Sequence, residues 1–237
     1  MFVQPHFVDT NGIRMAVYEQ GEGEPVILLH GFPELAFSWR HQLPALASAG
    51  YRAIAPDQRG YGRTTCPVDV DAYRIEELIA DVHGLLDALR LDSAVFVGHD
   101  WGALLLWHMA AVAPERIDKL ICLNIPHIAR PPIDPIELMR RRFGDDYYIV
   151  NFQDSDAAER AFAADTHRFF DAVMRKNQID REHFDKLPVD RKSINLLESL
   201  RRENPSGEAL LSDAERDYYA SAFAASGFTG PINWYRN

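Results

Sequence analysis

The pentapeptide at positions 98–102, Gly-His-Asp-Trp-Gly, carries the clearest chemical signal in the chain. It follows the apolar run 94–97, which is typical of a buried parallel strand, and precedes the apolar segment 103–110, which we expect to be helical. A small-x-acid-x-small pattern between a strand and a helix is typical of a nucleophile elbow. The central residue of most such elbows is Ser. Here it is Asp100, and a carboxylate attacks different substrates.

An ionised Asp100 at a helix N-terminus is favoured by the helix dipole and by free N–H groups. A carboxylate can displace a leaving group from a strained sp³ carbon and form an alkyl ester. Water must then attack the ester carbonyl, and this step develops an oxyanion. We expect the backbone N–H groups of Trp101 and Phe32 to stabilise that oxyanion. The alternative is an ordinary N-capping Asp, which would not need the glycines at positions 98 and 102.

The elements that position Asp100 follow from apolar runs and turn signals. Asn11-Gly12 lies between alternating apolar residues and predicts a hairpin. We expect buried strands at 26–29, 51–55, 94–97 and 119–123, and helices at 38–49 and 75–89. This alternation predicts an α/β fold with a mostly parallel, doubly wound sheet. Ligands bind such sheets at the C-terminal ends of the strands, where the elbow lies.

The sequence changes character at Asn124. Prolines at 126, 131, 132 and 135 make a stiff connection, and no apolar β-run follows between 136 and 236. Helical patterns occupy 156–163, 167–175 and 212–226, and the last opens with the capping-box pattern Ser212-x-x-Glu215. We therefore expect two domains, a core at 1–124 and a helical cap at 125–237.

Composition argues against several classes of partner. The net charge of −10 disfavours nucleic acid and anionic membranes, because both need a basic patch. The two cysteines, Cys66 and Cys122, have no metal-ligand spacing, and the N-terminus lacks the pattern of a signal peptide. We expect a cytoplasmic protein with no metal and no cofactor.

Four segments, in order along the chain, resemble the epoxide hydrolases of the α/β-hydrolase fold. They are His-Gly-Phe-Pro-Glu at 30–34, Asp-Gln-Arg-Gly-Tyr-Gly at 57–62, the pentapeptide at 98–102, and Gly-Pro-Ile-Asn-Trp-Tyr-Arg-Asn at 230–237. The resemblance implies a detoxification enzyme that hydrolyses an epoxide to a vicinal diol. It implies an incomplete α/β-hydrolase core, with about six strands present and the last two missing, and an inserted all-helical cap. It also implies a cis Phe32–Pro33 peptide and a substrate pocket that includes His30, Pro33 and Trp101.

In that family two cap tyrosines donate hydrogen bonds to the epoxide oxygen. The matching positions here are Tyr148, in a Tyr-x-x-x-Phe-Gln context, and Tyr235, in the last segment. A phenol, with a pKa of about 10, can donate to the alkoxide of an opening epoxide without being charged at rest. Either tyrosine alone could instead be a packing residue, and Tyr147 competes with Tyr148 for the match.

The family also uses an acid after the seventh strand and a general-base histidine after the eighth. We expect both to lie beyond Asn237, within a missing segment on the order of 70 residues. None of the nine histidines follows His183, and Asn124 stands at the alternative position for the acid. We therefore expect Asp100 to be alkylated once without turnover, and strand 119–123 to form an exposed edge.

Two alternatives stay open. A haloalkane dehalogenase would share Asp100 and hold a halide on Trp101, but its cap would present N–H donors rather than paired phenols. A catalytically incomplete fragment that only binds is the non-enzymatic alternative. We adopt an epoxide hydrolase whose partners are a small epoxide and water, and a homodimer is compatible with this interpretation.

Overall fold

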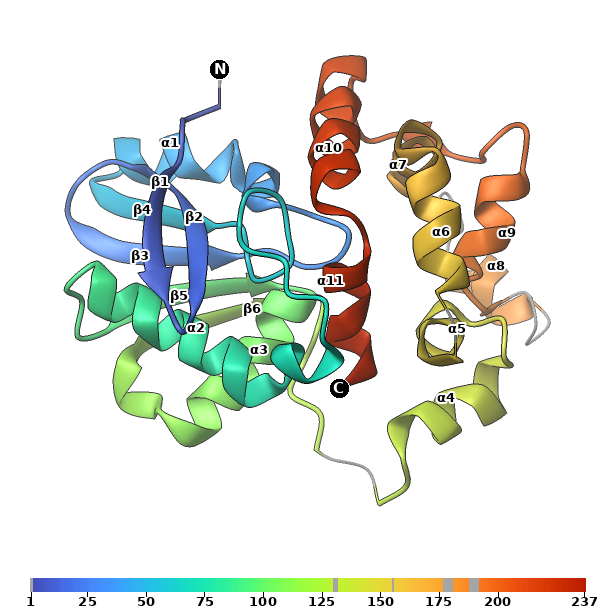
Figure 1. Ribbon diagram of the computed structural model, residues 1–237, viewed down its shortest axis with the longest axis horizontal. Helices are drawn as coiled ribbons and strands as arrows, with labels where there is room; N and C mark the ends of the chain where they lie inside the picture. Colours follow the sequence, from blue (N-terminus) through green and yellow to red (C-terminus); the bar gives the residue numbers. More distant parts are fainter. Residues whose placement is uncertain (1, 130–131, 155, 177–180, 188–191) are drawn as a thin grey trace. The chain divides into compact units, whose positions relative to one another are not determined.

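The computed structural model describes residues 2–129, 132–154, 156–176, 181–187 and 192–237. Contacts divide the chain into two compact units, Met1–Ile128 with Asn237, and Ala129–Arg236 (Figure 1). The first unit contains a six-stranded sheet, and the second is mainly helical.

The sheet of the first unit has the strand order β1-β2-β4-β3-β5-β6. Strands β4, β3, β5 and β6 run parallel to one another, whereas β2 is antiparallel to both of its neighbours. This mostly parallel sheet confirms the predicted fold class. The strands are β1 (His6–Thr10), β2 (Ile13–Gln20), β3 (Glu24–Leu29), β4 (Tyr51–Pro56), β5 (Ala94–His99) and β6 (Ile117–Leu123).

The β1–β2 hairpin turns at the predicted Asn-Gly pair. Asn11 has φ 42° and Gly12 has φ 74°, and Thr10 pairs with Ile13 across the turn. Two successive positive φ values are those of a type I′ turn, which asparagine and glycine tolerate best.

The helices of the first unit lie on both faces of the sheet. Val26 and Leu28 of β3 pack in one cluster with Leu43 of α1. Because successive strand residues point to opposite faces, Ile27 and Phe96 face the other side, which α2 and α3 cover (Figure 1). The helices are η1 (Ala36–Trp39), α1 (Gln42–Ser48), η2 (Val70–Tyr73), α2 (Ile75–Ala88), α3 (Trp101–Val112) and η3 (Pro114–Arg116).

The single helix predicted at 38–49 is in fact two short elements, η1 and α1. Pro44 explains the break. A continuous helix would require a hydrogen bond from the nitrogen of Pro44 to the carbonyl of Arg40, and proline has no N–H. In the observed structure Pro44 lies in the first turn of α1, where no such bond is needed.

The second unit confirms the predicted helices near 156–163, 167–175 and 212–226. The capping box is formed, since Ser212 Oγ accepts the N–H of Glu215 and the Glu215 carboxylate accepts the N–H of Ser212. The helices are α4 (Pro135–Phe143), α5 (Tyr148–Asp154), α6 (Ala157–Ala164), α7 (Thr166–Val173), α8 (Arg181–Lys186), α9 (Leu196–Arg201), α10 (Asp213–Ser226), α11 (Thr229–Asn233) and η5 (Trp234–Arg236). An antiparallel pair, β7 (Arg175–Lys176) with β8 (Glu208–Ala209), was not predicted.

Within the described part of the chain, β6 pairs only with β5 and forms an edge of the sheet, as predicted. Its side chains are partly exposed, with Ile121 at 49% and Leu123 at 40%. An edge strand with exposed apolar side chains is a site where another chain can add.

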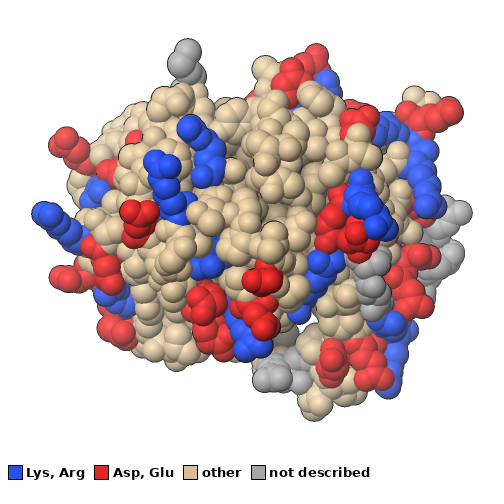
Figure 2. Space-filling view, viewed as in Figure 1, with Lys and Arg blue, Asp and Glu red and all other residues tan. Residues whose placement is uncertain are grey.

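The surface carries mixed charge. Figure 2 shows Lys and Arg interspersed with Asp and Glu over the face in view. None of the helices in the described ranges is long and apolar enough to cross a membrane.

Candidate active site

Asp100 lies at the junction of β5 and α3, in a sharply turned backbone. Its φ is 53° and its ψ is −118°, a conformation that costs a non-glycine residue on the order of 1–3 kcal/mol. Although Asp100 occupies the N-cap position of α3, its side chain makes no cap hydrogen bond. The geometry is therefore that of an elbow that presents the carboxylate, rather than that of an ordinary helix cap.

The two flanking glycines allow the backbone to approach itself closely. A Cβ on Gly98 would lie 2.6 Å from the backbone nitrogen of Ala103, and a Cβ on Gly102 would lie 2.3 Å from the carbonyl oxygen of Leu29. Both neighbours are backbone atoms of the sheet or helix, so they cannot move aside cheaply. The glycine spacing seen in the sequence thus has a steric cause.

Two backbone N–H groups donate to the Asp100 carboxylate. The N–H of Phe32 donates to Oδ1 at 3.0 Å, and the N–H of Trp101 is the second donor. The Phe32–Pro33 peptide is cis, as expected. Burial raises the pKa of Asp100, and the two N–H groups offset part of this rise. These are the two donors that the sequence suggested for an oxyanion.

The His30 side chain binds the backbone of the two segments that follow β3 and β4. Its side chain is fully buried, Nε2 accepts the N–H of Gln58 at 3.1 Å, and Nδ1 lies 2.9 Å from the carbonyl oxygen of Gly31. Since Nε2 is an acceptor, Nδ1 carries the proton and donates to Gly31. Burial lowers the pKa of His30 to about 4, so the ring is neutral at neutral pH. Both ring nitrogens are therefore bound to the main chain.

His99 is bound on both sides as well. Its Nδ1 lies 2.9 Å from the Glu34 carboxylate and its Nε2 lies 2.8 Å from the side-chain amide of Asn124. The hydrogen bond to Glu34 raises the pKa of His99. Burial raises the pKa of Glu34, but the hydrogen bond and charge of His99 outweigh it and leave that pKa lowered. The pair links the loop that carries Phe32 to the end of β5, next to Asp100.

The two cap tyrosines predicted from the sequence lie together in the second unit. The rings of Tyr148 on α5 and Tyr235 on η5 have centroids 5.7 Å apart and meet edge to face at 77°. Both rings also contact Phe152. The ring of the competing Tyr147 contacts that of Tyr148, with a distance of 5.0 Å between the ring centroids. Tyr219 on α10 stacks on Phe170 and is a buried packing residue.

Comparison with known proteins gives one consistent result. A family model described as the alpha/beta hydrolase fold matches residues 24–228. Epoxide hydrolase A of Mycobacterium tuberculosis is 41% identical over 97% of this chain and 72% of its own length. Epoxide hydrolase 3 of Siraitia grosvenorii is 42% identical over 97% of this chain and 71% of its own length.

This chain belongs to the epoxide hydrolase family of the α/β-hydrolase fold. Solved structures agree. The crystal structure of epoxide hydrolase A from Mycobacterium thermoresistibile superposes with a TM-score of 0.87 at 38% identity, over 99% of this chain and 74% of that one. An epoxide hydrolase from Vigna radiata gives a TM-score of 0.82 at 38% identity, over 99% and 71%.

In this member of the epoxide hydrolase family, a buried carboxylate joins two loops of the first unit. Asp57 accepts hydrogen bonds from the N–H groups of Ala36 and Arg63 and from the Tyr18 hydroxyl. Burial raises the pKa of Asp57 to about 6. Its role is to hold the turns that carry Ala36 and Arg63. The pairing of Glu34 with His99, by contrast, was not predicted, because a contact between two loops leaves no mark in residue spacing.

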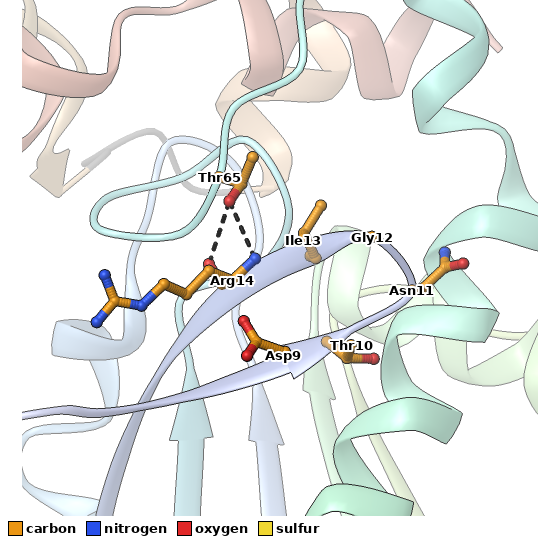
Figure 3. Close-up of a pocket in the computed structure, with 7 residues that line it drawn as sticks. All are labelled: Asp9, Thr10, Asn11, Gly12, Ile13, Arg14 and Thr65. Atoms are coloured by element: carbon orange, nitrogen blue, oxygen red, sulfur yellow. Dashed lines mark hydrogen bonds between the residues drawn. The ribbon is translucent and has the colours of Figure 1, made fainter.

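A separate hollow of about 540 Å³ opens beside the β1–β2 hairpin (Figure 3). Thr65 Oγ1 accepts the N–H of Arg14 and donates to its carbonyl oxygen there. The residues that line it are Asp9, Thr10, Asn11, Gly12, Ile13, Arg14 and Thr65, none of which belongs to the elbow or to the loop of Phe32. We therefore place the candidate chemistry of the first unit at Asp100.

Proposed function

We propose that this protein opens small epoxides through a covalent ester on Asp100. One carboxylate oxygen attacks an epoxide carbon, the carbon–oxygen bond of the ring breaks, and its electron pair goes to the epoxide oxygen. A phenol of Tyr148 or Tyr235 donates its proton to that oxygen and recovers one from solvent. The product of this step is a β-hydroxy ester of the enzyme.

The single observation that carries this proposal is the environment of the Asp100 carboxylate. The side chain makes no helix-cap hydrogen bond, and its Oδ1 accepts the N–H of Phe32 at 3.0 Å. Oδ1 would become the carbonyl oxygen of the ester, while Oδ2 attacks. When water adds to the ester, the charge that develops on Oδ1 would meet the same Phe32 N–H, and a donor at this position favours ester hydrolysis.

We propose that the phenols direct the enzyme to epoxides rather than to halides. An opening epoxide leaves an alkoxide that needs a proton, whereas a departing halide needs only N–H donors. The close pair formed by Tyr148 and Tyr235 supports the first substrate class. In functional terms, residues 1–124 would supply the nucleophile and the oxyanion donors, and residues 125–237 the phenols.

We further propose that the 237-residue chain stops at the ester. Hydrolysis needs a base to take a proton from water. The two histidines in the motifs around Asp100, His30 and His99, have both ring nitrogens bound to other groups. Neither is therefore available as that base, and the alkylated state would persist.

A cytoplasmic role in detoxification fits this chemistry. Both Cys66 and Cys122 are free thiols, as is usual in a reducing compartment. An enzyme that consumes epoxides removes alkylating agents before they reach other nucleophiles.

The test compares two substrates on one protein sample. After treatment with styrene oxide, intact-mass measurement should show one added epoxide per chain, and D100N should show none. Treatment with 1-chlorobutane should release no halide. Halide release without reaction of styrene oxide would favour a dehalogenase, and steady diol production over many turnovers would contradict the arrest at the ester.

A further inference from the structure

Hydrogen bonds and ring contacts tie α5 to η5 in the second unit, and the rings of both Tyr148 and Phe152 lie against that of Tyr235. Gln153, on α5, donates from Nε2 to the carbonyl oxygen of Tyr235 at 2.7 Å. Arg236, on η5, donates from Nε to the carbonyl oxygen of Phe152 at 2.7 Å. The elements that carry the two phenols are thus joined side by side.

The guanidinium of Arg236 binds several acceptors among the described residues. Besides the Phe152 carbonyl, it reaches Asn233 Oδ1 at 3.0 Å and Glu159 Oε1 on α6 at 2.7 Å, both from NH1. Phe152 is among the last four residues of α5, whose carbonyls have no partner within the helix. Arg236 therefore caps the C-terminal end of α5, the helix that carries Tyr148, and it is itself the residue that follows Tyr235.

Glu159 is the counter-ion of this contact and lies in the interior. It is only 8% exposed, and the Arg236 side chain is only 16% exposed. A buried ion pair adds little net stability compared with apolar side chains of similar size, because both charges must be desolvated. Such a pair does fix the orientation of its two side chains relative to each other, because the planar guanidinium binds a carboxylate in only a few geometries. The pair therefore determines where η5 lies relative to α5 and α6.

We infer that Arg236, Glu159 and Gln153 are positioning residues that hold the phenols of Tyr148 and Tyr235 at the spacing needed to donate to one epoxide oxygen. This inference rests on the proposed function, in which the phenols activate the epoxide. A donor must come within roughly 2.6–3.2 Å of its acceptor, so two donors on one oxygen require a narrow range of separations. Loss of the contacts made by Arg236, Glu159 and Gln153 would leave both tyrosines present but misaligned.

The experiment measures the rate at which styrene oxide alkylates Asp100 in a single turnover, followed by intact mass in the full chain. In E159Q the guanidinium remains buried without its counter-ion, and we expect alkylation to slow roughly tenfold, as for other small misplacements of catalytic groups. D156N is the matched control. Asp156 is three residues away, forms an exposed ion pair with Arg160 at 2.7 Å, and makes no cap hydrogen bond. Its removal should leave the rate unchanged.

A second background separates positioning from general damage to the fold. In Y235F only one phenol remains, so there is no pair to align. E159Q should then change the alkylation rate by less than roughly twofold, because two changes that act through one contact are not additive. An equal slowing by E159Q in both backgrounds would show a structural effect and overturn the inference.

The double variant E159L/R236M tests whether slow alkylation results merely from unfolding. Replacing a buried pair by apolar residues of similar size often preserves stability. We expect this variant to unfold at a similar urea concentration to the wild type but to alkylate slowly, like E159Q. Wild-type alkylation by a folded E159L/R236M protein would also contradict the inference. If Y235F itself alkylates at the wild-type rate, the proposed role of the phenols fails instead, which is a different result.

Discussion

Asp100 and the residues around it show how burial and hydrogen bonding divide the roles of similar side chains. Asp57 and Asp100 both accept backbone N–H groups, yet Asp57 also binds the Tyr18 hydroxyl and joins two loops. His30 follows β3 and His99 is the last residue of β5, but His30 is buried and neutral whereas His99 pairs with Glu34. The sequence placed Asp100 at the elbow. It did not reveal Glu34, whose partner is distant in the chain.

The two histidines should titrate on opposite sides of the ordinary value. His30 has its pKa lowered to about 4 from 6.5 by burial, whereas the hydrogen bond to Glu34 raises that of His99 above 6.5. NMR titration of the ring protons should find His30 neutral throughout pH 5–7, whereas the midpoint at which His99 loses its proton should lie above pH 6.5. The reverse order would show that the hydrogen bonds described for the two rings are wrong.

The lowered pKa of His30 makes the free energy of unfolding depend on pH. Because the folded pKa of His30 lies below its unfolded value, the unfolded chain binds more protons between about pH 4 and pH 6.5. The contribution of His30 to the free energy of unfolding is therefore complete above this window. It is lost as the pH falls through it.

At the level of elements, local signals predicted what local forces determine. The Asn-Gly hairpin, the helix expected at 75–89 and the capping box of α10 each depend on residues close in sequence, and all three were found. The helix predicted at 38–49 was wrong because Pro44 divides it. The β7–β8 pair has two residues in each strand, too few for a periodic pattern. Helix α5 was not predicted either, since tertiary contacts such as that of Arg236 complete it.

The elbow depends on its glycines, and substitution should show it. In G98A the new Cβ would lie 2.6 Å from backbone atoms of Gly102 and Ala103, so we expect a loss of roughly 3 kcal/mol or more in the free energy of unfolding. G12A is the matched control, because Gly12 has φ +74° but open space around it. Its cost should be about 1–2 kcal/mol, from the positive φ alone. Equal losses in urea titrations of the two variants would argue against a crowded elbow.

On the scale of the whole molecule, the family and the mostly parallel sheet could be predicted because four motifs occur in order along the chain. The expected domain boundary at 124/125 remains a prediction, and the division of the chain into two compact units falls between residues 128 and 129. The edge formed by β6 is a property of the sheet as a whole, since it depends on which strands pair. No single residue of β6 predicts that this strand lies at the edge.

The exposed edge predicts self-association. Ile121 is 49% exposed on β6, and a lysine there should oppose pairing with a second chain. We expect I121K to lower the aggregation measured by light scattering at high protein concentration. V112K is the control, because Val112 is 67% exposed on α3 rather than on the edge. A similar reduction by both variants would point to net charge instead of the strand edge.

The central claim, that Asp100 is the nucleophile, is tested most directly by locating the bond that an epoxide forms with the protein. The chain is treated with styrene oxide, digested, and its peptides are fragmented in the mass spectrometer. We predict one added epoxide, esterified to Asp100, and no adduct in D100N. An adduct on a cysteine, a histidine or another carboxylate, unchanged in D100N, would contradict the claim.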